Sequence, residues 1–367
     1  MGELHAAEIL NALAGAGAVY LLLRLLYAYA LPPLRLPMAL LLIAAPTAVR
    51  FAAEAYAEPL FLLLIAGFVV LWASERMLAG ALLLGLAYWV RPEAAALGAL
   101  LLGLSRRRVL ASLLAICVAL GEPVLRWIAT GDFTLTPLLG FYGLDFVDQQ
   151  PLLERLLAWP EAALRGTDLL WMPFALFGLL LCRRQLPGGA WRLGLAFALL
   201  QLAQLSFQVK PRFFQSQLPL LVLLAACFLR EFSRSRFVRS LCWAVAIGAS
   251  VLSVRDLWKP PRSDKLVELM LGESLREESL LPGELLTDMP RVAWAAGVPP
   301  PPPAEWTVQR LRPLLAQERV RVVVFGAKRE GRRQLATEFA QIFRAVSLPP
   351  ELRKRNSSDR LLLLRRR

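Results

Sequence analysis

Long apolar runs separated by short charged or proline-containing breaks make up the first 256 residues. The runs cover, approximately, residues 7–30, 37–53, 59–73, 77–90, 94–104, 109–129, 169–182, 190–209, 213–229 and 237–254. A straight membrane span needs about 20 apolar residues, so the longer runs predict transmembrane helices. The shorter neighbours, such as 77–90 and 94–104, predict discontinuous or re-entrant helices packed against protein. Residues 1–256 are therefore interpreted as a multi-spanning α-helical membrane domain.

The pattern changes at residue 257, where the runs become short and mixed. Residues 284–287 and 320–325 are typical of strands, and the second run ends at Gly326. Residues 263–278, 308–317 and 331–343 have helical spacing of apolar positions. We therefore predict a small α/β domain over residues 257–367, large enough to have a core of its own.

Composition supports this division. The chain is 57% hydrophobic and 19% charged, with a mean hydropathy of +0.52. It is too apolar for a water-solvated fold, and disordered or disulfide-rich classes are equally remote. Residues 1–256 hold 21 of the 42 basic and 15 of the 28 acidic residues, so charge density roughly doubles in the shorter second part. The net charge of +14 is interpreted as loop charge facing a cytoplasmic leaflet, and no nucleic-acid partner is expected.

Cysteine and histidine usage limits the metal chemistry. The four cysteines lie in or beside apolar runs, and His5 is the single histidine of the chain. A Cys/His zinc site or a disulfide framework is therefore not expected. No cofactor is predicted with certainty, and a divalent cation would have to be held by carboxylates.

Basic clusters predict the orientation in the membrane. Arginine-rich short loops stay in the cytoplasm, and the clusters at 106–108, 183–184 and 230–239 are separated by even numbers of predicted spans. The loop at 131–166 is then external, in agreement with its five acidic and two basic residues. The N-terminus and residues 54–58, 91–93, 210–212 and 257–367 are also placed outside. We predict a multi-pass protein of a cell membrane, bacterial inner membrane in type, with an extracytoplasmic C-terminal domain.

The first unusual group of charges is Arg50, Glu54 and Glu58, spaced four residues apart on one helix face with Tyr56 between. Ionisable groups at membrane depth usually face a cavity or a partner. Paired carboxylates can raise one pKa or hold a cation. A short, solvated external turn before Pro59 explains the same pattern, and the sequence leaves both readings open.

The second group is Tyr88, Arg91 and Glu93, around Pro92 and between two apolar runs. A guanidinium binds phosphate oxygens in bidentate fashion, and Tyr88 with Trp89 would line an acyl chain or a sugar face. The alternative is a helix break at which Arg91 pairs with Glu93 or extends to the interface. We favour a binding role for Arg91.

The third group is Lys210 and Arg212, between two apolar runs on the predicted external side. Two cations there oppose the positive-inside tendency, so an anionic partner is expected. Membrane headgroups would serve as well as a bound substrate.

These groups fall in motifs that resemble a known family. The segments EAYAEPLFL (54–62), LAGALLLGLA (78–87) and RPE (91–93) resemble, in order and spacing, motifs of polytopic GT-C-fold glycosyltransferases that use polyprenyl-phosphate sugars. Protein mannosyltransferases and aminoarabinose transferases are of this kind. KPRFF (210–214) with LPL (218–220), and LTDMPRVAWAAG (286–297), resemble two later elements of the same family. The resemblance covers most of the chain.

The resemblance implies an enzyme that transfers a sugar from a polyprenyl-phosphate donor to a glycan, lipid or protein acceptor at the external membrane face. Arg91, Arg212 and Lys210 are then the expected contacts of the lipid phosphate. Glu54, Glu58, Glu93 and Tyr88 are expected to shape the site.

One family feature has no counterpart in the sequence. Family members carry a further N-terminal helix and an external loop with an acidic catalytic pair before the span that corresponds to residues 7–30. We therefore expect a chain that starts late, with its catalytic residues unidentified, or a non-catalytic relative or subunit that binds lipid-linked sugar. Asp132, Asp145 and Asp148 are possible substitutes, although their spacing does not argue for it. A transporter is a weaker expectation because no internal repeat is found.

Overall fold

The computed structural model describes residues 2–43, 58–131, 152–166, 171–181, 190–207, 214, 217–232, 234–257, 263–298, 308–326, 331–348, 352 and 361–367. It divides into two compact units, Met1–Trp258 and Lys259–Arg367. The change of pattern in the sequence had predicted a division after Asp256, two residues before the end of the first unit. Each unit is considered by itself.

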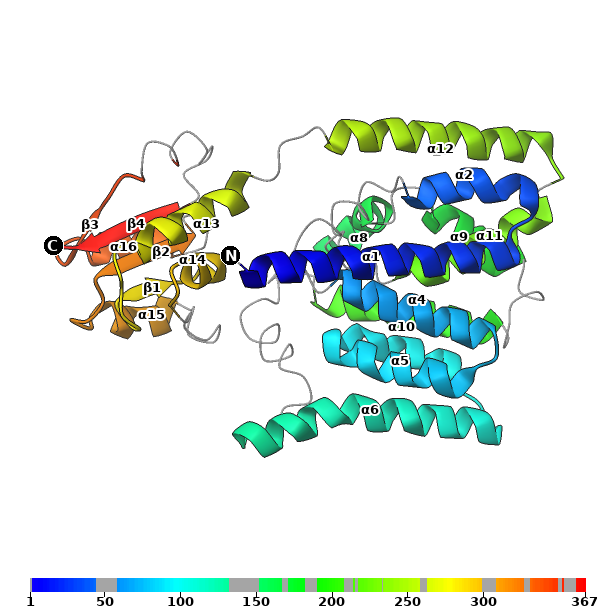
Figure 1. The fold of residues 1–367 in the computed structure, drawn as a ribbon, viewed down its shortest axis with the longest axis horizontal. Coiled ribbons are helices and arrows are strands. Elements are labelled where there is room, and N and C mark those ends of the chain that lie inside the picture. The colour runs from blue at the N-terminus through cyan, green and yellow to red at the C-terminus, as the bar shows by residue number, and fades with distance from the viewer. Residues whose placement is uncertain are drawn as a thin grey trace. The chain divides into compact units, whose positions relative to one another are not determined.

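All regular secondary structure among the described residues of the first unit is helical (Figure 1). Its elements are α1 (Gly2–Tyr29), α2 (Pro32–Ile43), α4 (Glu58–Ala73), α5 (Met77–Val90), the 3-10 helix η1 (Pro92–Leu101), α6 (Arg106–Thr130), α8 (Leu152–Gly166), α9 (Trp171–Leu181), α10 (Ala190–Phe207), α11 (Leu218–Phe232) and α12 (Arg236–Leu257). Helices α1, α4, α5, α6 and α12 run with roughly parallel axes.

Neighbouring helices in the sequence also pack together in space. Helix α4 lies between α1 and α5, and α5 in turn packs on α6. Helices α9 and α11 form a second close pair, and α11 also contacts α1. One continuous core of leucine, alanine and aromatic side chains joins these helices. Many large apolar side chains of α1, α6 and α12 remain exposed, which is typical of helices that face lipid.

Two helices in the described part of the chain are long and apolar enough to cross a membrane, at Ile9–Tyr29 and Arg106–Ala129. The shorter apolar helices are Pro32–Ile43, Pro59–Ala73, Met77–Val90, Pro92–Leu101 and Arg192–Ala203. The predicted short runs are therefore helical but below the length of a straight span. The number of membrane crossings, put at about ten segments from the sequence, stays a prediction.

Residues 131–166, predicted as an external loop, include a helix in the part that the structure describes, and their external position stays a prediction. Residues 152–166 form helix α8, whose Leu153 and Leu157 are exposed while Ala162 and Ala163 are buried. The acidic content of the segment concealed this amphipathic pattern. The predicted helix at residues 94–104 is also different, because it is a 3-10 helix that starts at Pro92 and ends at Leu101.

The second unit contains a four-stranded sheet in the order β1-β2-β4-β3. Its elements are α13 (Ser263–Arg276), β1 (Leu285–Thr287), α14 (Pro290–Ala295), α15 (Val308–Leu315), β2 (Val322–Gly326), α16 (Arg332–Glu338), β3 (Phe343–Ala345) and β4 (Leu361–Arg366). Strands β1 and β2 are parallel, with Leu285 opposite Val322, whereas β4 is antiparallel to both β2 and β3.

Alternation along β2 creates two cores, one on each face of this sheet. Val322 and Val324 pack with α13 and α14, while Val323 and Phe325 pack with α15 and α16. The strands predicted at 284–287 and 320–325 lie where β1 and β2 are found. The predicted helix at 331–343 is wrong at its end, because β3 starts at Phe343. Helix α14 and strand β4 were not predicted.

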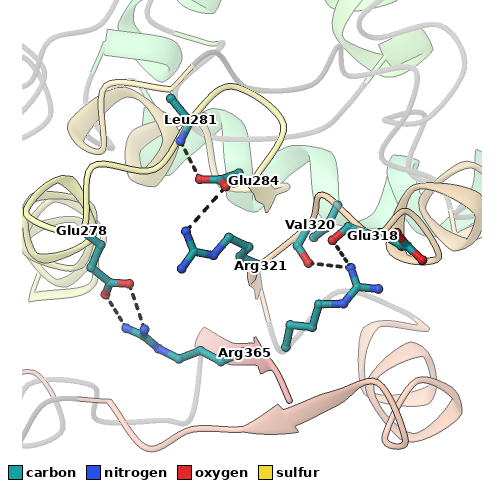
Figure 2. A network of polar contacts seen from close by, with 8 residues as sticks. Glu278, Leu281, Glu284, Glu318, Val320, Arg321 and Arg365 are labelled. Atoms are coloured by element: carbon teal, nitrogen blue, oxygen red, sulfur yellow. Dashed lines mark hydrogen bonds and ion pairs between the residues drawn. The ribbon is translucent and has the colours of Figure 1, made fainter.

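Ion pairs join Arg365 of β4 and Arg321, just before β2, to the turns between α13 and β1 (Figure 2). Arg365 binds both carboxylate oxygens of Glu278, and Arg321 Nη1 lies 3.6 Å from Glu284 Oε1. Glu284 also accepts the backbone N–H of Leu281 at 2.8 Å. The Arg321 side chain is largely exposed and that of Arg365 is partly exposed, so these contacts hold the turn before β1 rather than provide most of the stability.

Candidate functional site

The break between α5 and η1 places Arg91 at a fixed position in the first unit. Proline has no backbone N–H and restricts the residue before it to extended conformations, so a proline at position 92 ends α5. Arg91 accordingly has φ −154° and ψ 129°. Its own N–H still donates to Ala87 O at 2.9 Å, while Pro92 begins the next helical segment. The guanidinium therefore projects from a defined turn between two helices.

The Arg91 side chain is held by an ion pair and by an aromatic ring. Its Nη2 lies 2.6 Å from Glu93 Oε1, and its Nε lies 3.4 Å from Glu93 Oε2. On another side, the guanidinium carbon lies 5.5 Å from the centre of the Phe61 ring, within the range of a cation–π contact. Arg91 is 7% exposed, so this charge lies inside the unit rather than at its surface.

The contact between Arg91 and Phe61 joins two of the motifs identified in the sequence. Phe61 lies in the first turn of α4, three residues after Glu58 and two after the buried Pro59. Because α4 packs on α5, the start of α4 and the end of α5 meet. The EPLF and RPE segments therefore meet in space through Phe61 and Arg91, which are 30 residues apart in the chain.

The structure describes only some of the other residues that the sequence predicted. Tyr88 is half-buried near the end of α5, next to Trp89, whose Nε1 donates to Val118 O of α6 at 2.6 Å. Glu58 is the first residue of α4, and its side chain lies outside the described residues. Seven further candidates also lie outside the described residues: Glu54, Lys210, Arg212, Arg50, Asp132, Asp145 and Asp148. Their parts in the site stay predictions.

Metal ligands do not gather in the part of the chain that the structure describes. Within those residues no group of three or more His, Cys, Asp or Glu side chains could hold a metal ion. The arrangement around Arg91 instead offers a buried guanidinium, paired with Glu93, beside an aromatic ring. Glu93 balances the charge and sets the plane of the guanidinium.

Two polar arrangements were missed by sequence reasoning. At the other end of η1, the carbonyl oxygen of Leu100 accepts from Trp72 Nε1 at 3.0 Å and from Arg108 Nη1 at 3.0 Å, and Leu102 O accepts from Arg192 Nε at 2.7 Å. These donors replace the hydrogen bonds that a helix end lacks. The second arrangement joins Gln201 and Gln217. Glutamines inside apolar runs were the available signal.

Comparison with known proteins concerns the fold. No protein-family model and no curated protein sequence matches the chain. The structure is similar to that of ArnT from Cupriavidus metallidurans in the apo state, with a TM-score of 0.59 and 11% identity over 97% of this chain and 83% of the ArnT chain. Its similarity to the same ArnT bound to undecaprenyl phosphate has a TM-score of 0.58 and 12% identity, over 98% of this chain and 83% of that one.

At 11% and 12% identity the two proteins share the arrangement of their helices but little of their sequence. The likeness extends over nearly the whole chain, including both compact units. The fold expected from the resemblance to polytopic GT-C glycosyltransferases is confirmed, and the chain has the fold of ArnT.

Proposed function

We propose that this chain is a membrane glycosyltransferase that takes a sugar from a polyprenyl-phosphate donor and passes it to an acceptor at the extracytoplasmic face. The observation that carries the proposal is the buried guanidinium of Arg91, held at the α5–η1 break against Phe61. The shared fold with ArnT, which has been crystallised with undecaprenyl phosphate, supports a lipid phosphate as the anion.

Arg91 is proposed to contact the phosphate of the donor lipid. During transfer the bond between the sugar C1 and the phosphate oxygen breaks, and an acceptor oxygen forms the new bond to C1. The acceptor proton goes to a base, and the polyprenyl phosphate departs with increased negative charge. A guanidinium in a poorly hydrated site stabilises that charge more than it would in water. Lys210 and Arg212 are proposed as further phosphate contacts, on the evidence of the sequence.

Glu93 is proposed to position Arg91 rather than to react. A carboxylate bound to Nε and Nη2 fixes the guanidinium plane and lowers the cost of burying the charge. Glu54, Glu58 and Tyr88 are proposed to shape the site around the sugar and the acyl chain. The catalytic base is not assigned to any residue. Residues 257–367 are proposed to form an extracytoplasmic domain beside a multi-pass region in a bacterial inner membrane.

The first test is lipid binding by the full chain in nanodiscs. Undecaprenyl phosphate should bind the wild type, and Arg91→Ala should weaken the affinity about 10- to 100-fold, because a charge-assisted hydrogen bond is lost. Arg126→Ala is the matched control, since Arg126 also pairs with a glutamate, Glu122, in the same unit. Equal binding by wild type and Arg91→Ala would contradict the phosphate role.

The second test is turnover. Sugar-loaded undecaprenyl phosphate is incubated with the nanodiscs and an acceptor-containing membrane extract, and release of undecaprenyl phosphate is followed by lipid mass spectrometry. We expect release by the wild type and none by Arg91→Ala. Binding without release would favour the alternative, a non-catalytic protein that holds lipid-linked sugar.

A further inference from the structure

Three polar side chains from separate segments form a hydrogen-bonded chain inside the first unit. Trp159 of α8 donates its Nε1–H to Gln201 Oε1 of α10 at 3.1 Å. Gln201 Nε2 then donates to Gln217 Oε1 at 2.6 Å, immediately before α11. Phe214 packs edge-on against the Trp159 ring at 6.1 Å and is fully buried. The chain is therefore held by α8, α10 and the start of α11.

The direction of this chain follows from tryptophan chemistry. The indole N–H can donate but cannot accept, so the Gln201 atom facing Trp159 must be its oxygen. The Gln201 amide nitrogen is then the atom that faces Gln217, and it requires the Gln217 oxygen as its acceptor. The NH2 group of Gln217 is left at the end of the chain. This orientation does not depend on distinguishing nitrogen from oxygen in the amide itself.

The terminal NH2 group lies in a position where it needs a partner. Gln217 is 0% exposed, and its Nε2 has no hydrogen-bond partner among the described residues. A buried donor without an acceptor is unfavourable, particularly in a membrane protein, and such groups in membrane segments usually mark substrate positions. The three-residue chain keeps the donor in one orientation instead of letting it turn toward another acceptor. A preorganised donor of this kind suits a ligand oxygen.

We infer that the Gln217 NH2 group donates a hydrogen bond to an oxygen in the polar head of the polyprenyl-phosphate substrate, with Gln201 and Trp159 as positioning residues. This inference rests on the proposed function. The position fits, because Gln217 follows Lys210 and Arg212 by seven and five residues, on the side of the membrane predicted to be external. The acceptor is either a phosphate oxygen or a sugar hydroxyl, both of which a neutral amide can bind.

The test uses Gln217→Met in the full chain in nanodiscs, with Gln309→Met, an exposed glutamine of the second unit, as the matched control. Methionine has similar length and no donor. Undecaprenyl phosphate and undecaprenyl phosphoglucose serve as probes. We expect about tenfold weaker binding by Gln217→Met, the loss of one hydrogen bond, and unchanged binding by Gln309→Met. A loss with both probes identifies a phosphate oxygen, whereas a loss with the glucosylated probe alone identifies a sugar hydroxyl.

Unfolding without ligand separates this role from a structural one. Gln217→Met removes an unpaired buried donor, which is favourable, but it leaves Gln201 Nε2 without its acceptor, which is unfavourable. Because these two effects offset each other, the unfolding temperature should change little. If Gln217 has only a structural role, Gln217→Met should lower that temperature and leave the lipid affinity of the folded fraction unchanged. That result would overturn the inference. If Gln217→Met does not fold, Gln217→Asn keeps the amide but withdraws it, and weaker binding is again expected.

Failure of the two proposals can be told apart. No binding of either probe by the wild type contradicts the proposed function and the inference together. Suppose instead that the wild type binds the probes, that Arg91→Ala weakens this binding and that the Gln217 variants do not. This result contradicts the inference alone.

Discussion

Arg91 Nη2 and Glu93 Oε1 lie 2.6 Å apart across Pro92, with side chains that are 8% and 16% exposed. The two charges belong to residues separated by one position, at a break where neither lies within a regular α-helix. The pair therefore forms between neighbouring residues at the break itself. Under the proposed function, a substrate phosphate would meet a guanidinium already oriented by its carboxylate.

Removing the carboxylate should take away one compensating charge from a buried cation. We expect Glu93→Ala to destabilise the protein by about 3–5 kcal/mol, measured by thermal unfolding in nanodiscs. Glu122→Ala, which breaks the more exposed Arg126 pair of α6, should cost clearly less. Equal losses for the two variants would show that Arg91 is not desolvated. The stability loss of Glu93→Gln should lie between those of Glu93→Ala and Glu122→Ala, because the amide oxygen still accepts a hydrogen bond.

Gly178 brings α9 close to the backbone of α11. A Cβ at this position would lie 2.2 Å from Leu224 O, so Gly178→Ala must push the two helices apart. We expect a loss of about 1–3 kcal/mol or more in unfolding experiments. Gly194→Ala of α10 is the control, because no atom lies within 4 Å of its Cβ position. That variant should be neutral or slightly stabilising, as alanine favours helix.

Asp288 and Arg332 form a buried ion pair in the second unit. Arg332 Nε donates to Asp288 Oδ2 at 2.8 Å, and Asp288 Oδ1 accepts the Gly326 N–H at 3.0 Å. The Arg332 side chain is 5% exposed and that of Asp288 is 0% exposed. Asp288→Ala should raise hydrogen exchange across β1 and β2 of the full chain, with a cost of about 3–5 kcal/mol.

The exposed pair of Arg312 and Glu338 provides the comparison. Hydrogen bonding to Glu338 raises the pKa of Arg312, but both side chains are well exposed to solvent. Arg312→Ala should leave exchange in β1 and β2 unchanged. If Arg312→Ala raises hydrogen exchange as much as Asp288→Ala does, burial of the ion pair does not determine its contribution to stability.

Orientation in the membrane can be tested with single cysteines. Ser105 precedes α6 beside the arginines at 106–108, and Ala158 lies on α8, and both are exposed. In a variant without native cysteines, a membrane-impermeant maleimide added to intact spheroplasts should label Ala158→Cys and not Ser105→Cys. Labelling of Ser105→Cys alone would invert the predicted topology. Labelling after membrane disruption confirms that both thiols are reactive.

Periodicity predicted much of the local structure because apolar spacing and proline act within a few residues. The run at 77–90 is α5 with the same limits, and Pro92 marks the break that follows it. Strand β2 lies within two residues of its predicted start for the same reason. Helix α8 was missed because its charged positions resemble a loop, and β4 because its four leucines lie between charged residues at the end of the chain.

The sequence by itself determined the composition of the two units, the helix break at Pro92 and the presence of a cation beside it. The sequence had left pairing of Arg91 with Glu93 as one alternative, and the structure shows this pair. Only the tertiary structure decided that Arg91 packs against Phe61 and that Gln217 ends a directed chain of hydrogen bonds. The physical reason is range. Backbone restriction by proline is local, whereas burial of a guanidinium or an amide depends on helices that are brought together by the whole core.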